Sequence, residues 1–189
     1  AARFYFSRDR SRYVAARGML RVLLGNYLGA ASAAIALEST SHGKPVLADR
    51  SIPVLFNLAH AEDLAIYALA RDCVPGIDIE NLDRAVDHDA LARRLFSARE
   101  YAELQRIPNA ERNRAFLACW TCKEAVAKAV GQGLSLALDR IGVTVDPHEP
   151  PRVIDAPQGD VREWTLQRVD VGSAYVATLA SYRPPRNPS

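Results

Sequence analysis

Apolar residues recur at helical and at strand-like spacing in successive stretches of the chain. Steps of three and four predict a helix from Ser7 or Asp9 to about Tyr27, and another in the stretch 116–134, FLACWTCKEAVAKAVGQGL. Helical segments over 89–105 break near Phe96 and Ser97. Strand-like runs are predicted at 33–40, 54–58, 64–69, 76–80 (GIDIE), 141–145, 164–171 and 175–182. This mixture of elements predicts an α+β protein.

The dipeptide Pro75–Gly76 divides this pattern. It interrupts two strand-like runs without a long polar linker, which predicts a hinge over residues 73–76. Each side combines helices with a few strands. The expected architecture is two pseudo-symmetric α+β lobes, an N-terminal one at 1–75 and a C-terminal one at 76–182, followed by a disordered tail at 183–189, RPPRNPS.

The helix predicted over 116–134 carries an acid and a base one turn apart. Trp120, Glu124 and Lys128 follow each other at steps of four, so they lie along one stripe, and Gly131 and Gly133 predict the end of the helix. A Glu four residues before a Lys is commonly a solvated ion pair that contributes a few tenths of a kcal/mol. The pair alone therefore does not indicate a site.

The acids of GIDIE change this interpretation. Alternation along a strand puts Asp78 and Glu80 on one face. Together with Glu124 they would form an oxygen-rich set of the kind that Mg²⁺ binds with substrate phosphates. Lys128 would supply a proton or a positive charge beside the metal. The pattern favours phosphorus chemistry.

Composition narrows the class of protein. The 189 residues are 49% hydrophobic and carry a formal charge of +2, which does not demand a nucleic-acid partner. Six arginines among the first 21 residues indicate a local anion site. No apolar run reaches the roughly 18 residues of a membrane span, so a cytoplasmic location is expected.

The cysteines favour a reducing compartment, because three of them are an odd number for a disulfide framework. Cys119 and Cys122 form a CxxC motif inside the predicted helix. No second pair completes four zinc ligands, and no strand leads into the motif. We therefore expect two buried helix cysteines.

Four further polar residues each have an ordinary role and a possible functional one. Arg12 is either a surface residue or a phosphate ligand, Lys44 is either solvated or held against a ligand by the rigid Pro45, and His60 is either structural or a ligand. Glu100 stands three residues after Ser97, as in a capping box, and could also face the other acids.

Several sequence blocks, in order, resemble the 4'-phosphopantetheinyl transferases of the larger, Sfp type. They are RFYFSRDRSRYVAARGMLR, HGKP, FNLAH, GIDIE and WTCKEAVAKAVGQGL, within residues 3–182. The resemblance implies two pseudo-symmetric α+β lobes with coenzyme A between them. It also implies transfer of the phosphopantetheine arm of coenzyme A to a serine of an apo acyl or peptidyl carrier protein, by a monomer.

The resemblance also implies roles for individual residues. Asp78, Glu80 and Glu124 would hold Mg²⁺, with Glu124 as general base and Lys128 at the leaving group. Coenzyme A would be bound by Arg12, Lys44 with Pro45, His60 and Lys128, and Glu100 would have an auxiliary catalytic role.

Two departures from the family keep other functions open. FNLAH has Ala59 where the family commonly has serine, and the family usually has further residues before RFYF, including basic residues that help to hold the nucleotide. The alternatives are a Mg²⁺-dependent nucleotide-pyrophosphate hydrolase and a non-catalytic carrier-binding fragment.

Overall fold

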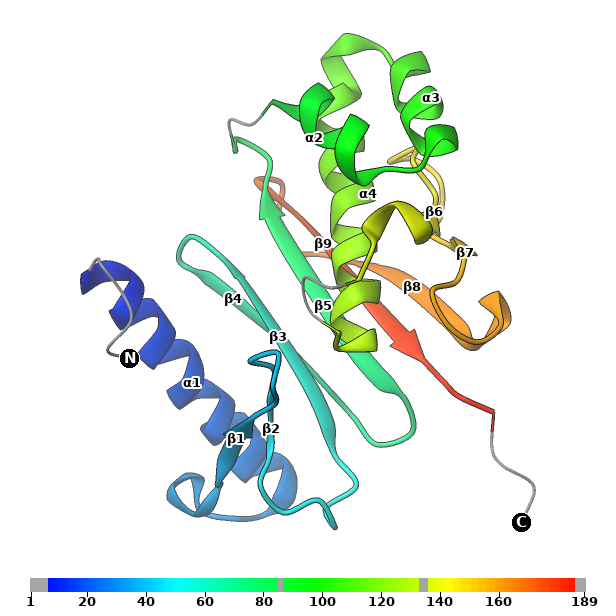
Figure 1. Ribbon diagram of the computed structural model, residues 1–189. Helices are drawn as coiled ribbons and strands as arrows, with labels where there is room; N and C mark the ends of the chain where they lie inside the picture. The colour runs from blue at the N-terminus through cyan, green and yellow to red at the C-terminus, as the bar shows by residue number, and fades with distance from the viewer. Residues whose placement is uncertain (1–6, 85–86, 133–135, 186–189) are drawn as a thin grey trace. The chain divides into compact units, whose positions relative to one another are not determined.

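The structure, a computed structural model, describes residues 7–84, 87–132 and 136–185 (Figure 1). Four α-helices in these ranges are α1 (Ser7–Leu28), α2 (His88–Leu95), α3 (Ala98–Arg106) and α4 (Asn109–Val130). The strands are β1 (Leu37–Ser39), β2 (Pro45–Leu47), β3 (Leu55–Ala61), β4 (Leu64–Ala70), β5 (Val74–Asn81), β6 (Gly142–Val143), β7 (Val153–Asp155), β8 (Trp164–Val169) and β9 (Tyr175–Tyr182). Short 3-10 turns are η1 (Ser32–Ala34), η3 (Leu138–Arg140) and η4 (Val161–Glu163). The expected α+β class is confirmed.

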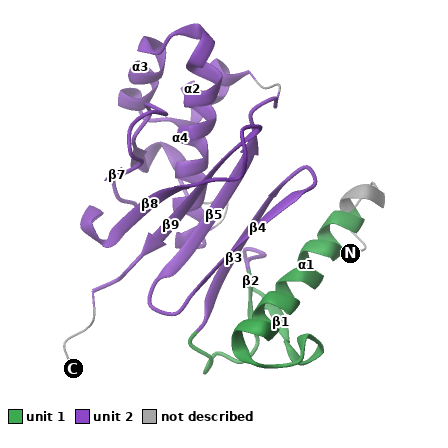
Figure 2. Cartoon of the chain, turned by 180° about the vertical axis from the view of Figure 1, so that it is seen from behind, with its two compact units in different colours: residues 1–40, 45–53 green, residues 41–44, 54–189 purple. Residues whose placement is uncertain are grey.

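The chain forms two compact units (Figure 2). The first consists of residues 1–40 and 45–53 and contains α1 and the antiparallel pair β1–β2. Its α1 buries Leu20 and Leu24. The second consists of residues 41–44 and 54–189 and contains all the other strands and helices. The units divide elsewhere than at residue 76, and the two-lobe division expected there stays a prediction.

The second unit is built on an antiparallel sheet in the order β5-β9-β8. Leu166, Val176 and Ala180 turn one face of this sheet to the core formed with α4. The alternate residues Ile77, Ile79 and Ala177 turn the other face to the β3–β4 hairpin. The hairpin and α4 therefore lie against opposite faces of the sheet. Because side chains alternate along a strand, β5 turns hydrophobic residues toward the hairpin and can present polar residues to α4.

Pro75 and Gly76 lie inside β5 and not in a hinge. Proline is tolerated because β5 is an edge strand of its sheet, where a missing N–H breaks no ladder bond on the outer side. Ile77, two residues on, donates its N–H outward to Asn57 Oδ1 at 3.1 Å, which shows that odd-numbered residues of β5 point their N–H away from β9. The hinge predicted over residues 73–76 is therefore wrong as local structure, because residues 74–76 belong to a strand.

Most other elements fall near their predicted positions. α4 begins earlier than predicted and ends at Gly131, whose φ of 80° is the left-handed stop; Gly133 lies outside the described residues. The strand expected at 33–40 shrinks to β1, and that expected at 141–145 shrinks to β6. β2 and β7 were not predicted, and residues 186–189 of the expected tail lie outside the described ranges.

Candidate active site

The site begins at Gly76, where the backbone of α4 packs tightly against β5. A Cβ at Gly76 would overlap the carbonyl oxygen of Ala125 and lie 2.5 Å from the amide nitrogen of Ala129. Only a glycine allows this approach. Since Gly76, Asp78 and Glu80 alternate along β5, the two carboxylates lie on the same face as Gly76 and are directed toward α4.

Lys128 reaches Asp78 across this contact. Its Nζ donates to Asp78 Oδ1 at 2.6 Å, and only 6% of Asp78 is exposed. The second oxygen, Oδ2, is buried and has no hydrogen-bond partner among the described residues. Burial, and to a smaller extent the charges of Glu124 and Glu80, raise the pKa of Asp78 to about 6 against the opposing effect of Lys128. Negative charge in this site is thus only partly compensated.

Glu80 and Trp120 form the second link between β5 and α4. Trp120 Nε1 donates to Glu80 Oε1 at 3.1 Å, and Arg84 Nη1 donates to the same oxygen. Trp120 and Lys128 lie two turns apart on α4, so the stripe predicted from their spacing does face β5.

Glu124 stands on α4 between those two links. None of the described residues forms a hydrogen bond to its carboxylate. Burial raises its pKa, the charge of Lys128 lowers it, and the charge of Glu80 raises it. A half-buried carboxylate with a raised pKa has the properties of a general base.

The side chain of Lys44, which lies outside α4 in the sequence, reaches the C-terminal end of this helix. Its Nζ donates to the backbone oxygen of Lys128 at 2.8 Å, and burial lowers its pKa. A cation there complements the negative end of the helix dipole. The structure thus brings Lys44 next to Lys128.

The remaining expected ligands belong to other elements. Arg12 on α1 and Pro45 in β2 belong to the first compact unit, and His60 is exposed on β3. Their roles toward coenzyme A stay predictions.

The residues of the site fit Mg²⁺ in chemistry. Within the described ranges, no group of three or more His, Cys, Asp and Glu side chains is placed to hold a metal ion. Instead, two of the carboxylates form ion pairs with side-chain cations, Asp78 with Lys128 and Glu80 with Arg84. A hard cation bound among these oxygens would nevertheless give the buried Oδ2 of Asp78 a partner. It would also lower the raised pKa values of Asp78 and Glu124, because a positive charge stabilises their ionised forms.

The raised pKa of Asp78 makes stability depend on pH. Because its folded pKa of about 6 exceeds its ordinary 3.8, the folded chain holds this proton more tightly than the unfolded chain between these values. Asp78 therefore lowers the free energy of unfolding as pH rises through that window, by about 1 kcal/mol per pH unit. The Asp78→Asn variant should lose this decrease, as measured by urea unfolding at several pH values.

Asp160 provides a control of opposite sign. Hydrogen bonds from Arg162 lower the pKa of this exposed carboxyl to about 2, so its stabilising contribution disappears only as the pH falls below 4. A pH profile of Asp78→Asn that parallels the wild type would contradict the burial of the Asp78 carboxylate.

Glu100 forms the capping box predicted with Ser97. Ser97 Oγ accepts from Glu100 N at 3.2 Å, and Glu100 Oε2 accepts from Ser97 N at 2.8 Å. The side chain is 0% exposed, and Val143 N and Lys123 Nζ also donate to it. The capping role is confirmed. The auxiliary catalytic role stays a prediction without support from these contacts.

Lys123 is the buried partner of Glu100, and the sequence analysis missed it. It is 0% exposed, and its Nζ donates to Glu100 Oε2 at 2.6 Å and to the backbone oxygen of Ile141. The missed signal is its position: Lys123 lies four residues after Cys119 and three before Val126, on the apolar side of α4. A lysine there must have a buried partner.

Breaking this buried pair should be costly. The Lys123→Met variant leaves the Glu100 carboxylate buried without its cation, and we expect a loss of about 3–5 kcal/mol in the free energy of unfolding. The double variant Lys123→Met, Glu100→Gln should recover part of that loss, because no lone charge remains. Chemical denaturation measures both, with the exposed Arg94→Met as control. A Lys123→Met protein as stable as the wild type would contradict the ion pair.

The CxxC cysteines are buried in α4, as predicted. Burial raises the pKa of both Cys119 and Cys122. Both are free thiols.

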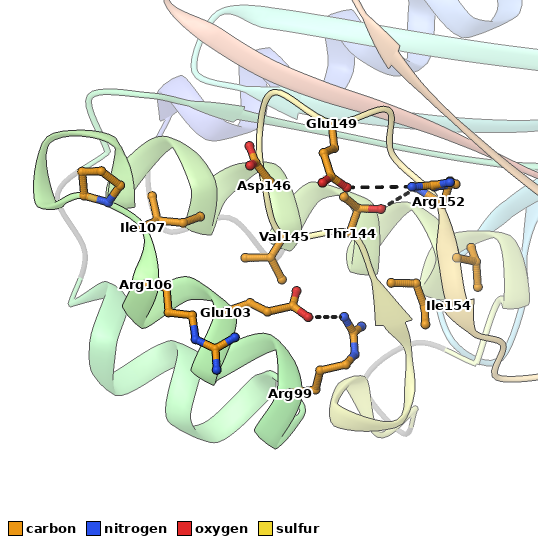
Figure 3. A pocket seen from close by; sticks show the side chains of 12 residues that line it. Arg99, Glu103, Arg106, Ile107, Thr144, Val145, Asp146, Glu149, Arg152 and Ile154 are labelled. Atoms are coloured by element: carbon orange, nitrogen blue, oxygen red, sulfur yellow. Dashed lines mark hydrogen bonds and ion pairs between the residues drawn. The ribbon is translucent and has the colours of Figure 1, made fainter.

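A separate cavity of about 680 Å³ lies between α3 and the β6–β7 region (Figure 3). None of the residues predicted for the site lines it. Arg99 pairs with Glu103, and Arg152 with Glu149, so its charges largely compensate each other. We assign it no role.

Comparison with known proteins agrees with the motifs. The sequence profile of the 4'-phosphopantetheinyl transferase superfamily matches residues 75–180, and that of the 4'-phosphopantetheinyl transferase N-terminal region matches residues 1–72. The chain belongs to the 4'-phosphopantetheinyl transferase superfamily.

Individual relatives bear the same name. The 4'-phosphopantetheinyl transferase HetI of Nostoc sp. is 40% identical over 182 residues, which are 95% of this chain and 74% of HetI. The 4'-phosphopantetheinyl transferase ffp of Bacillus subtilis is 29% identical over 96% of this chain and 79% of its own length. A putative transferase of Synechocystis sp. is 29% identical, with 57% of its length covered.

Among solved structures, one match is a holo-(acyl-carrier-protein) synthase from Bacillus anthracis in complex with CoA. It is 23% identical, has a TM-score of 0.46, and the match covers 59% of this chain and 98% of that one.

No helix among the described residues is long and apolar enough to cross a membrane.

Proposed function

We propose that this protein transfers the 4'-phosphopantetheine arm of coenzyme A to a serine of an apo acyl or peptidyl carrier protein and releases adenosine 3',5'-bisphosphate. Membership of the superfamily supports the reaction class. The observation that carries the assignment to residues is the pairing of α4 with β5, where Lys128 meets Asp78 and Trp120 meets Glu80. Beside these contacts lies the carboxylate of Glu124, to which none of the described residues is hydrogen-bonded.

The chemistry needs a base at the serine and positive charge at the leaving group. Glu124 accepts the proton of the serine hydroxyl as its oxygen attacks the β-phosphorus, and its raised pKa suits it to that task. The bond from this phosphorus to the adenosine bisphosphate breaks, and Lys128 neutralises the departing phosphate.

Asp78, Glu80 and Glu124 would hold Mg²⁺ here. When bound, the ion polarises the phosphoryl oxygens and offsets their charge. Lys128 would then exchange its contact with Asp78 for one with the leaving phosphate, a movement that its long, partly exposed side chain permits.

The family motifs support a role for four residues in the binding of coenzyme A. Lys44 with Pro45, Arg12 and His60 would contact the nucleotide and its phosphates. The two pseudo-symmetric lobes, the monomeric state and the cytoplasmic location belong to the same proposal.

The test combines the purified chain with coenzyme A, Mg²⁺ and several apo carrier proteins. The carrier should gain the mass of phosphopantetheine, and adenosine 3',5'-bisphosphate should appear in equal amount. Release of the bisphosphate with an unmodified carrier would identify a pyrophosphate hydrolase instead. Carrier binding without either product would identify a non-catalytic module.

A further inference from the structure

A row of polar residues crosses the sheet beneath α4. Arg168 on β8 stands opposite Thr178 on β9, and Thr178 stands opposite Asp78 on β5. Directly opposed residues of an antiparallel pair point to the same face of the sheet. The side chains of all three therefore lie on the face that α4 covers.

Arg168 ties this row to the helix. Its Nη1 lies 3.0 Å from the backbone oxygen of Ala118, 3.0 Å from Thr178 Oγ1 and 3.3 Å from Cys122 Sγ. Thr178 Oγ1 is also 3.0 Å from Thr121 Oγ1 of α4. One guanidinium thus joins two turns of α4 to the strand next to Asp78.

The charge of Arg168 is not explained by an ion pair. Among the described residues, no carboxylate forms a salt bridge with it, and its Nη2 is buried without a hydrogen-bond partner. A half-buried cation without a counter-charge, with one donor nitrogen buried and unsatisfied, costs free energy that an uncharged side chain at this position would avoid. Its directional hydrogen bonds are what a hydrophobic residue could not supply.

We propose that Arg168 is a positioning residue of the transfer reaction, which fixes the rotation of α4 so that Glu124 and Lys128 face the carboxylates of β5. The inference rests on the proposed function. Ala118 and Cys122 lie on the sheet side of α4, and the stripe of Trp120, Glu124 and Lys128 flanks that side. A turn of the helix about its axis therefore moves the stripe relative to Asp78, and displacements of about 1 Å can cost 10²-fold in rate.

The proposal is tested by Arg168→Met, which keeps the apolar stem and removes the guanidinium, and by Arg168→Lys, which restores one charged donor. Gln167→Met on the same strand is the control, because residue 167 is exposed and faces away from α4. We expect Arg168→Met to lower kcat about tenfold or more at a temperature where it remains folded, with KM for coenzyme A little changed. Arg168→Lys should recover part of kcat.

A second readout does not depend on activity. The chain has two tryptophans, so Trp164→Phe leaves Trp120 as the only indole, and its emission reports the position of the stripe. Arg168→Met should shift this emission, and Gln167→Met should not. An unchanged emission with unchanged kcat would overturn the proposal, even if thermal stability fell. An inactive wild type would overturn the transfer function itself, and the emission would then still show whether Arg168 orients α4.

Discussion

Replacing Glu124 by Gln is expected to abolish phosphopantetheine transfer and leave the fold intact. Glutamine has nearly the same shape but cannot accept the serine proton, and loss of a general base typically costs about 10²–10⁴-fold in rate. The substitution also removes one of the three proposed metal ligands. None of the described residues is hydrogen-bonded to this carboxylate, so the neutral side chain leaves no buried partner unsatisfied. Transfer rates with a saturating carrier measure the effect.

The matched control is Glu111→Gln in the first turn of the same helix. Glu111 pairs with His148 at the surface, so its loss should change neither rate nor fold noticeably. Circular dichroism establishes that both variants keep their helices. A fully active Glu124→Gln enzyme would contradict the role of Glu124 as general base.

Gly76→Ala should damage both stability and activity. The added methyl would meet the backbone of α4 at Ala125 and Ala129, and backbone cannot move aside as a flexible side chain can. Overpacking of this kind costs about 1–3 kcal/mol. Because α4 must withdraw from β5, the contacts of Lys128 with Asp78 and of Trp120 with Glu80 should lengthen, and transfer should fall more steeply than stability alone explains. Denaturant unfolding and transfer kinetics test the two effects.

Gly18→Ala is the control for this substitution. Gly18 lies in α1, and a Cβ there would meet no heavy atom within 4 Å. Alanine favours a helix over glycine by about 1 kcal/mol, so this variant should be slightly more stable. If Gly76→Ala behaves like Gly18→Ala, the close approach of α4 to β5 is contradicted.

Periodicity could predict the part of the site that depends on local structure. The step of four places Trp120, Glu124 and Lys128 on one stripe, and the step of two places Asp78 and Glu80 on one face. The structure confirms that two members of the stripe bond to the two acids. The motif blocks predicted the family, and the sequence profiles confirm it.

Tertiary contacts explain what the sequence could not show. The dipeptide Pro75–Gly76 predicted a hinge between lobes, but the same dipeptide also fits an edge strand that a helix approaches closely. Which of the two applies depends on whether a helix passes over the glycine, and α4 comes from a distant part of the chain. Lys123 and Arg168 were missed for a similar reason, since their partners are separated from them by 10 to 50 residues along the chain.

The sequence left two roles open for Glu100, helix capping and auxiliary catalysis, and the structure confirms the first. The capping box follows from the spacing of Ser97 and Glu100. The pairing with Lys123 does not, because it requires α3 and α4 to meet. A carboxylate that is 0% exposed and bonded through both oxygens has a sufficient structural role.

A crystal structure of the protein with coenzyme A and Mg²⁺ tests the central claim most directly. We predict one cation in contact with oxygens of Asp78, Glu80 and Glu124 and with the pyrophosphate of coenzyme A, and Lys128 Nζ moved from Asp78 Oδ1 to the phosphate. A cation held by other residues, with Lys128 still on Asp78, would contradict the account.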